Sequence, residues 1–324
     1  MSGVAAILVT GGAGFVGSHA AKALAEVGRA VVVLDDLSTG RREFARWGTF
    51  VEGDAGDARL VDKVCRDHGV TAVLHFAGRV SVAESVARPE LYRRANVDVT
   101  ARLAEAARRA GVRHFVFSSS AAVYGTPTVS PIPETHPLSP TSPYGENKVE
   151  AERALATSGL DVAVLRYFNA AGAEAGLYEA HDPETHLIPL AIDAAITGLA
   201  LTVHGTDWPT PDGTCVRDYV HVGDLARAHL AALSRLEAGR GGGAWNLGSG
   251  RGHSVREVVD AVSKAVGGSP IAVREGPRRP GDGSSLVADP GRAWTDLGWK
   301  AERSAIGTIV RDALASIRGR TFAT

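Results

Sequence analysis

Residues 4–36 read VAAILVTGGAGFVGSHAAKALAEVGRAVVVLDD. The apolar run at 4–10 is typical of a buried parallel strand. Glycines follow it at once, an Ala-rich segment with helical spacing leads to Gly28, and a second apolar run occupies 31–34. The order of strand, glycine turn, helix, strand and acid predicts a βαβ unit. Such a unit is typical of the start of an α/β fold.

Three glycines in this stretch suggest a ligand. Gly11, Gly14 and Gly17 fit the dinucleotide fingerprint in its spaced form, Gly-x-x-Gly-x-x-Gly. Such glycines allow a tight turn, close approach of a pyrophosphate and close helix–strand packing, and the helix N-terminus offers free N–H groups. Asp35 would accept from both ribose hydroxyls and repel a 2′-phosphate, which favours NAD over NADP. The alternative is a glycine turn in an unrelated α/β protein.

The alternation continues beyond this unit. Strands are predicted at 49–51, 72–76, 113–117 and 162–167, and helices at 58–68 and 91–110. This pattern predicts a Rossmann-type doubly wound parallel sheet with helices on both faces. Ligands bind beyond the carboxyl ends of such strands, where Asp54, Gly78 and Ser120 fall. The alternative for each of the three is an ordinary turn or cap residue, which for Asp54 taken alone is equally well supported. A Pro-, Thr- and Ser-rich loop at 123–143 is expected over that edge.

A tyrosine and a lysine four residues apart suggest proton chemistry. Tyr144 and Lys148 share one face if their segment is helical, and Ser142 and Pro143 are suited to the N-cap and the first turn. A nearby cation and the positive end of the helix dipole are expected to lower the pKa of the phenol. A phenol tuned in this way can take a proton from a sugar hydroxyl. An ordinary surface pair has the same spacing.

Composition narrows the class of protein. The chain has 324 residues with a formal net charge of −1, so it lacks the excess of positive charge that is typical of nucleic-acid-binding proteins. Cys65 and Cys215 give no disulfide framework, and the histidines show no familiar metal-ligand spacing, so no metal is expected. We find no signal peptide and no apolar stretch of about 18 residues for a membrane span. A cytoplasmic setting is the default.

After residue 170 the pattern changes. Helices are predicted at 187–196, 303–318 and 223–236, the last capped by Asp224, and short strands at 201–203, 216–220 and 244–247. A basic turn with a restricted backbone conformation is expected at 278–282. We therefore expect an NAD-binding domain at 1–170 and a smaller α/β lobe at 171–324 that mainly binds the substrate. Some segments of 171–324 could return to the sheet of the first domain.

Longer motifs extend these observations. The chain carries DDLSTG at 35–40, HFAG at 75–78, FSSSAAVYG at 117–125, LRYFN at 165–169 and PDGTCVRDYVH at 211–221. Together with the glycine motif and the Tyr-x-x-x-Lys pair, they make the chain resemble an extended short-chain dehydrogenase/reductase over its whole length. Within that group it is similar to the UDP-glucose 4-epimerase family.

The resemblance implies a reaction and a site. A retained NAD takes hydride from C4 of a UDP-hexose and returns it to the opposite face, so that UDP-glucose and UDP-galactose interconvert. Tyr144 would be the base, Lys148 would hold the nicotinamide ribose and Ser120 the 4-oxygen. The implied NAD positions are Gly11, Gly14, Phe15, Val16, Gly17, Asp35, Asp36, Leu37, Ser38, Thr39, Gly40, Asp54, Ala55, Phe76, Ala77, Gly78, Asn96, Ser118, Tyr144, Lys148 and Phe168. The implied substrate positions are Ser120, Tyr144, Asn169, His186, Leu187, Thr202, His204, Arg217, Arg279, Asp282 and Leu286. A homodimer through helices near 91–110 and 142–158 is also implied.

Some positions depart from the family pattern. Val80, beside Arg79, stands where many members carry a lysine that contacts NAD. His204 stands where an aromatic side chain commonly lies near uracil. Leu286 occupies the position thought to gate the sugar pocket, and its intermediate size leaves acceptance of N-acetylated sugars open.

Three other functions remain as alternatives. The chain could epimerise another nucleotide sugar, such as a UDP-N-acetylhexosamine, a UDP-uronate or a dTDP-sugar. A 4,6-dehydratase is disfavoured, because Ala121-Ala122 replace the acidic pair that related dehydratases carry after the strand end. A non-catalytic NAD-binding regulator on the same fold is the third. It would have no need of Ser120, Tyr144 and Lys148 together.

Overall fold

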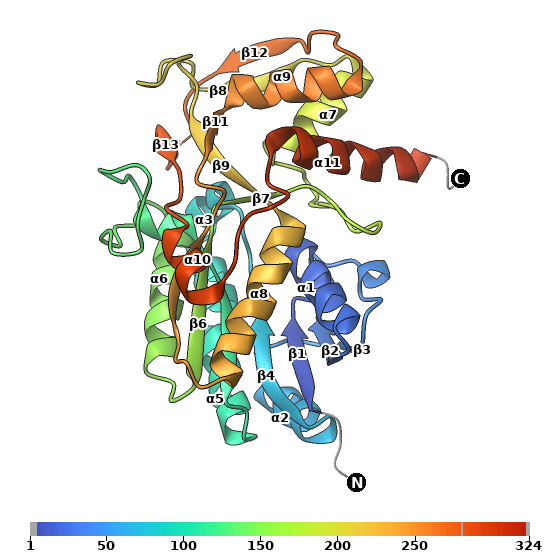
Figure 1. Ribbon diagram of the computed structural model, residues 1–324, viewed down its shortest axis with the longest axis vertical. Coiled ribbons are helices and arrows are strands. Elements are labelled where there is room, and N and C mark those ends of the chain that lie inside the picture. Colours follow the sequence, from blue (N-terminus) through green and yellow to red (C-terminus); the bar gives the residue numbers. More distant parts are fainter. Residues whose placement is uncertain (1–4, 280, 322–324) are drawn as a thin grey trace.

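The computed structural model describes residues 5–279 and 281–321, so Val4 of the first predicted strand and Pro280 of the predicted turn lie outside the described residues. Its largest layer is a seven-stranded sheet in which every neighbouring pair is parallel. The strand order runs through β3 (Thr49–Glu52), β2 (Ala30–Asp35), β1 (Ala6–Thr10), β4 (Val70–His75), β5 (His114–Ser120), β6 (Asp161–Tyr167) and β10 (Gly243–Leu247) (Figure 1). The alternation predicted a Rossmann-type doubly wound parallel sheet, and this strand order is the one that such a fold has.

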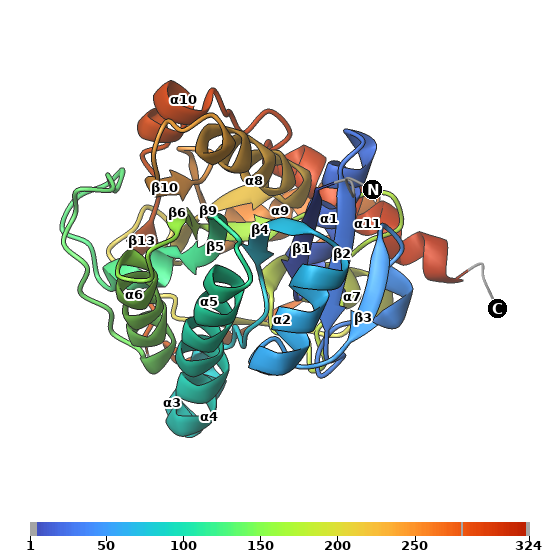
Figure 2. The ribbon, with the colours of Figure 1, turned by 90° about the horizontal axis from the view of Figure 1, so that it is seen from below.

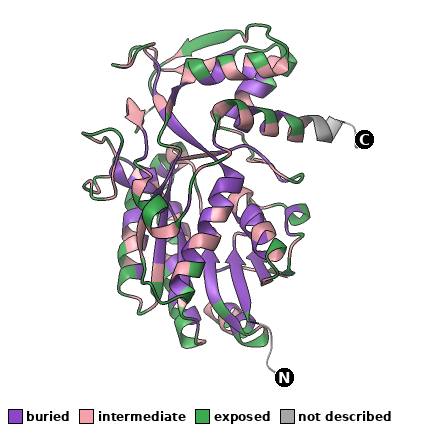
Figure 3. Ribbon diagram, viewed as in Figure 1, coloured by how far each residue is buried: buried purple, intermediate pink, exposed green. Residues whose placement is uncertain are grey.

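Helices cover both faces of this sheet (Figure 2). In β1, Ile7 and Val9 join one apolar cluster while Ala6 and Leu8 join the other, because side chains alternate along a strand. The first cluster includes side chains of α1 (Phe15–Glu26) and α8 (Val222–Glu237). The second includes side chains of α2 (Ala58–Asp67), α5 (Val99–Arg109) and α6 (Pro143–Ala156). Figure 3 shows the buried strands between these more exposed helices.

The helix predicted over 91–110 is interrupted. It consists of α4 (Pro89–Arg93), a π-helical turn, η2 (Arg94–Asp98), and then α5. A short helix that the sequence did not predict, α3 (Val82–Ala87), precedes them. The wider turn carries Asn96, whose side chain is buried. Single π turns of this kind frequently occur at functional sites.

A second lobe lies beyond the carboxyl ends of the large sheet (Figure 1). Its core joins α7 (Leu187–Thr197), α9 (Val255–Val266) and α11 (Ile306–Thr321). Strand β8 (Leu201–His204) pairs with β12 (Val273–Gly276), and β9 (Val216–His221) pairs with β7 (Asn169–Ala171), β11 (Gly252–Ser254) and β13 (Ser285–Leu286). The sequence did not predict α9, α10 (Gly291–Leu297) or the strands of two to four residues numbered β7, β11, β12 and β13.

Two late segments belong to the first layer. Strand β10 pairs with β6 at the edge of the large sheet, and α8 packs against α1. The predicted Asp224 cap of α8 is wrong, because His221 is the N-cap and its Nδ1 accepts from the Gly223 N–H at 3.0 Å. Asp224 is buried one turn further on and accepts from Ser304 Oγ at 2.6 Å. In the described parts of the chain, none of the helices combines the length and the apolar character needed to cross a membrane.

Candidate functional site

The glycine turn after β1 is packed so closely against neighbouring backbone that Gly11 and Gly17 have no room for a side chain. A Cβ on Gly11 would lie 2.4 Å from the Ala77 backbone nitrogen, and Gly11 has a φ of +70°. A Cβ on Gly17 would lie 2.2 Å from Gly11 O. Helix α1 starts at Phe15 and Val16, and its N-cap, Gly14, has no side chain to bond the first N–H groups. The turn therefore presents free donors and the positive helix end to an anion, which fits a pyrophosphate.

The acid after β2 is held in place by the backbone. Asp35 is buried and accepts from the Ala13 and Leu37 N–H groups, each at 2.9 Å. Burial raises the pKa of Asp35, and these two hydrogen bonds oppose the rise. Asp36 is exposed and accepts from the backbone and hydroxyl of Ser38, within the loop that continues through Thr39 and Gly40. Two acids at this edge suit ribose hydroxyls better than a 2′-phosphate.

A third stretch of expected cofactor residues lies at the ends of β3 and β4. Asn96 accepts from the Arg79 N–H at 2.8 Å and donates to Arg79 O at 3.0 Å, so it holds the loop that follows Phe76, Ala77 and Gly78. The Arg79 side chain is engaged with Glu84, while Val80 is exposed. After β3, Asp54 is exposed and accepts from Gly56, and Ala55 is buried. The wide π turn thus places Asn96 against the Gly78 loop.

The expected catalytic side chains meet at the end of β5. Ser142 caps α6 by accepting from the Gly145 N–H at 3.2 Å, as predicted, and Pro143 opens the helix. The Ser120 hydroxyl lies beside the Tyr144 phenol, close enough to lower its pKa. Lys148 Nζ donates to Ser118 O at 2.7 Å and lies 5.8 Å from the centre of the Tyr144 ring. The three side chains come from a strand end and one helix face, which is the arrangement that the spacing predicted.

The pKa values of this pair differ from the prediction. Burial raises the pKa of Tyr144, and only the neighbouring Ser120 hydroxyl lowers it. Burial also lowers the pKa of Lys148 to about 8, against the attraction of Glu152. The expected lowering of the phenol pKa by the lysine is therefore wrong for the chain by itself, because desolvation of Tyr144 outweighs the favourable contacts.

The sequence did not predict a buried network of hydrogen bonds and an ion pair behind Lys148. Glu152 accepts from Ser119 Oγ at 2.5 Å and from Arg166 at 2.6 and 3.1 Å. Arg166 also donates to the Tyr124 hydroxyl at 3.0 Å. A signal was available, because Glu152 follows Lys148 by four residues, as Lys148 follows Tyr144.

The expected substrate residues lie mainly in the second lobe. Arg217 Nη2 donates to Asp282 at 3.1 Å, and Leu286 pairs with Arg217 across β13 and β9. A cavity of about 330 Å³ is lined by Thr202, His204 and Arg279 together with Leu190, Asp193 and Leu199. A Cβ on Gly281 would lie 3.9 Å from Ser142 Cβ, so this turn reaches the first turn of the Tyr144 helix.

Three further positions lie at the junction of the lobes. Phe168 is buried after β6, and its N–H donates to Leu247 O at 3.0 Å. Asn169 opens β7, opposite Tyr219 of β9. His186 is the N-cap of α7, directly before Leu187. Burial lowers the pKa of His186, but the Glu179 and Glu184 carboxylates outweigh it and raise the pKa to about 10.

Comparison with known proteins identifies the family. Residues 7–248 match the NAD dependent epimerase/dehydratase family. UDP-glucose 4-epimerase of Azospirillum brasilense is 47% identical over 95% of this chain and 91% of its own length. The crystal structure of UDP-glucose 4-epimerase from Brucella ovis in complex with NAD has a TM-score of 0.92, with 46% identity, 96% of this chain and 98% of that chain covered.

A further solved structure combines the cofactor with a nucleotide. UDP-glucose 4-epimerase from Bifidobacterium longum, in complex with NAD⁺ and UDP, has a TM-score of 0.91 at 36% identity, with 98% of this chain and 100% of that chain covered. Identity and coverage at these levels extend through both lobes. The chain belongs to the NAD dependent epimerase/dehydratase family, among the UDP-glucose 4-epimerases.

Proposed function

We propose that this chain interconverts UDP-glucose and UDP-galactose with a retained NAD. One observation carries the proposal. Ser120 and Tyr144 lie side by side at the carboxyl edge of the sheet that also bears the glycine turn, with Lys148 one helical turn away. NAD, when bound, accepts a hydride from a sugar carbon and gives it back. The Brucella ovis relative was solved with this cofactor.

The protein side chains would handle the proton and the orientation. Tyr144 takes the proton of the sugar 4-hydroxyl and returns it, while Ser120 hydrogen-bonds the same oxygen. Because burial raises the pKa of Tyr144, the phenolate depends on the neighbouring Ser120 hydroxyl and on positive charge beside the ring. Lys148 Nζ lies over the Tyr144 ring, 5.8 Å from its centre. It does not lower the pKa of Tyr144 in the chain by itself, and we propose that it supplies part of that charge once NAD and the sugar complete the site.

The nucleotide and sugar would be held by the second lobe. Arg217 and Arg279 are suited to a diphosphate, because a guanidinium stays charged and can donate two parallel hydrogen bonds. Asn169, His186, Leu187, Thr202, His204, Asp282 and Leu286 would complete the site. We therefore propose that 1–170 mainly binds NAD and that 171–324 mainly binds the UDP-sugar, with α8 and β10 completing the first layer.

We also propose a homodimer that pairs the α4–α5 and α6 helices of two chains, in the cytoplasm. Cys65 and Cys215 are free and buried, which suits a reducing compartment. Sedimentation at micromolar concentration should give twice the chain mass. A monomer under those conditions would contradict the dimer, and cell fractionation tests the compartment.

The reaction is tested with purified protein and no added NAD. Incubation with UDP-galactose should yield UDP-glucose, which would establish both the reaction and the retained cofactor. UDP-N-acetylgalactosamine, UDP-galacturonate and dTDP-galactose, run in parallel, test the other sugar nucleotides and the size limit at Leu286. If UDP-galactose stays unchanged with and without added NAD while one of the others reacts, the substrate proposed here is wrong.

Tyr144→Phe tests the base. Removing one hydroxyl from a buried ring preserves packing, so folding and NAD content should match the wild type. Loss of the proton-transfer group should lower kcat by at least ~10²–10⁴-fold. Product formation from UDP-galactose measures kcat, and NAD released on denaturation serves as the control. Turnover near the wild-type rate would exclude Tyr144 as the base.

A further inference from the structure

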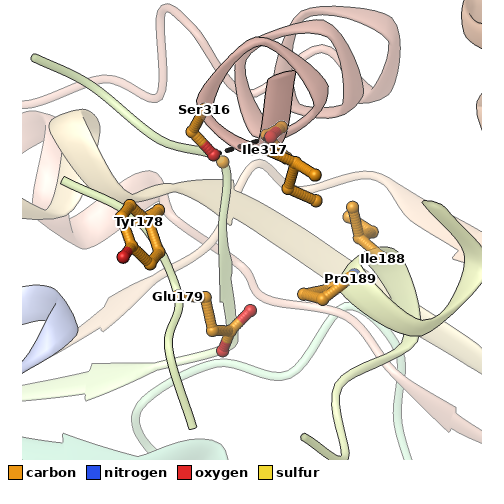
Figure 4. A pocket seen from close by; sticks show the side chains of 8 residues that line it. Tyr178, Glu179, Ile188, Pro189, Ser316 and Ile317 are labelled. Atoms are coloured by element: carbon orange, nitrogen blue, oxygen red, sulfur yellow. Dashed lines mark hydrogen bonds between the residues drawn. The ribbon is translucent and has the colours of Figure 1, made fainter. Parts of the chain in front are cut away.

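Four metal-ligating side chains gather in the segment before α7. They are Glu179, His181, Glu184 and His186, and their ligand atoms all lie within 4.8 Å of one another. Their spacing is Glu-x-His, two intervening residues, then Glu-x-His. Figure 4 shows Glu179 in a small pocket that it lines with Ile188 and Pro189. The proposed catalytic chemistry of Ser120, Tyr144 and Lys148 makes no use of this cluster, and His186 is the one member that is also a proposed substrate residue.

The cluster has more acceptors than hydrogens to share. His186 Nδ1 lies 2.8 Å from Glu184 Oε1 and 3.0 Å from Glu179 Oε1, yet one ring nitrogen carries at most one hydrogen. His181 Nδ1 is buried without a hydrogen-bond partner, 3.6 Å from the same Glu179 oxygen. Buried polar atoms of this kind normally have a partner. A single cation among the four groups would accept one lone pair from each of them.

The separations suit a small transition-metal ion. Ligands at ~2.0–2.1 Å from a tetrahedral Zn²⁺ lie roughly 3.3 Å apart. Three of the observed separations, 2.8, 3.0 and 3.6 Å, bracket that value, and all four ligand atoms lie within 4.8 Å of one another. Two imidazoles with two carboxylates suit Zn²⁺ and its neighbours, whereas Ca²⁺ and Mg²⁺ prefer oxygen alone.

Charge and burial favour the same ion. With both imidazoles neutral, Glu179 and Glu184 bring two negative charges, which a divalent cation balances. The Glu179 side chain is only 8% exposed, so its charge is costly to leave without a full partner. Asp182 and Pro183, between the two Glu-x-His halves, are exposed, so an ion can reach the cluster from solvent.

We propose that Glu179, His181, Glu184 and His186 bind one divalent transition-metal ion of the zinc class. The ion joins the two halves of the 179–186 segment and fixes that segment at the start of α7. It is a structural site, and its test does not depend on the proposed epimerase activity. The competing arrangement is a closed ion-pair cluster in which His186 stays protonated between the two carboxylates and no metal binds.

Co²⁺ is the probe, because tetrahedral Co²⁺ absorbs strongly in the visible range. The full-length protein is stripped with a chelator, dialysed and titrated with CoCl₂ near neutral pH. We expect an absorption band that saturates at one Co²⁺ per chain, that ZnCl₂ abolishes by competition, and that accompanies proton release as His186 gives up its proton. Absence of a saturable band together with absence of Zn²⁺ binding by calorimetry would overturn the proposal.

Two variants locate the ion. His181→Ala and Glu179→Gln should each weaken Co²⁺ binding at least ~10-fold, since even the residues that support ligands are worth that much. His68→Ala, at the C-cap of α2 near the opposite end of the molecule (Figure 1), should bind Co²⁺ as the wild type does. Circular dichroism checks that each variant folds, and His181→Gln replaces any variant that does not. Equal affinity in the wild type and all ligand variants would place the ion elsewhere and contradict the assignment.

Discussion

At the scale of single residues, the protonation of Lys148 depends on a balance of burial and charge. Burial holds its pKa at about 8, and the Glu152 carboxylate is the charge that opposes a further fall. Glu152 is itself fixed by Ser119 and Arg166. A buried ion pair behind the proposed catalytic lysine thus keeps a cation within reach of Tyr144. Lys148 loses that charge as the pH rises through its pKa.

Glu152→Gln should therefore shift the pH profile of the enzyme. The amide keeps the shape of the side chain but removes the negative charge, so the pKa of Lys148 should fall. If the cationic form of Lys148 is the active one, the alkaline limb of kcat should move to lower pH. Rates measured across neutral and alkaline pH test this.

Glu150→Gln is the matched control for that profile. Glu150 lies two residues away on the same helix, is only half-buried and pairs with Arg93. Its replacement should leave the alkaline limb where it is in the wild type. If Glu152→Gln only lowers the rate at every pH, Glu152 acts through packing and not through the charge on Lys148.

At the scale of elements, the long periodic segments were predictable and the short irregular ones were not. The strand–glycine–helix order and the Ser142-Pro143 helix start rest on local sequence rules, and the structure confirms both. The π turn around Asn96 and the His221 cap depend on tertiary contacts, and histidine is not among the usual cap residues. The order of strands in the sheet was implied by the fold class, whereas the pairing of two-residue β13 with β9 has no periodic signal.

The packing of α1 against its strand gives a prediction for two helical glycines. Gly17→Ala places a methyl group 2.2 Å from Gly11 O, which pushes the helix from the glycine turn. We expect a loss of about 1–3 kcal/mol in unfolding free energy and reduced NAD retention. Gly307→Ala, in α11, meets no atom within 4 Å and should raise stability by up to ~1 kcal/mol. Denaturant unfolding and NAD content measure both effects, and equal behaviour of the two variants would refute the steric argument.

At the scale of the whole molecule, a series of ion pairs and hydrogen bonds connects the second lobe to the first. Glu174, after β7, accepts from Lys22 of α1 at 2.8 Å and also pairs with Arg303. Arg303 donates to Asp312 of α11 at 2.8 Å, and His221 Nε2 lies 3.1 Å from the same carboxylate. These contacts link α1 of the large sheet with α11 of the smaller lobe. Their strength should depend on pH, because the central group is a carboxylate.

Lowering the pH should weaken this connection between the lobes. Burial tends to raise the pKa of Glu174, but Lys22 and Arg303 outweigh it, so its folded pKa lies below the unfolded value of about 4.3. Its contribution to stability is therefore complete above the unfolded pKa and is lost as the pH falls through the folded one. Glu174→Gln should cost stability at pH 7 and little in strong acid, so the gap between the unfolding free energies of the two proteins should close on acidification. Glu26→Gln, which touches the same Lys22 but is 57% exposed, should show a much smaller gap. A gap for Glu174→Gln that stays constant with pH would show that the carboxylate charge does not hold the lobes together.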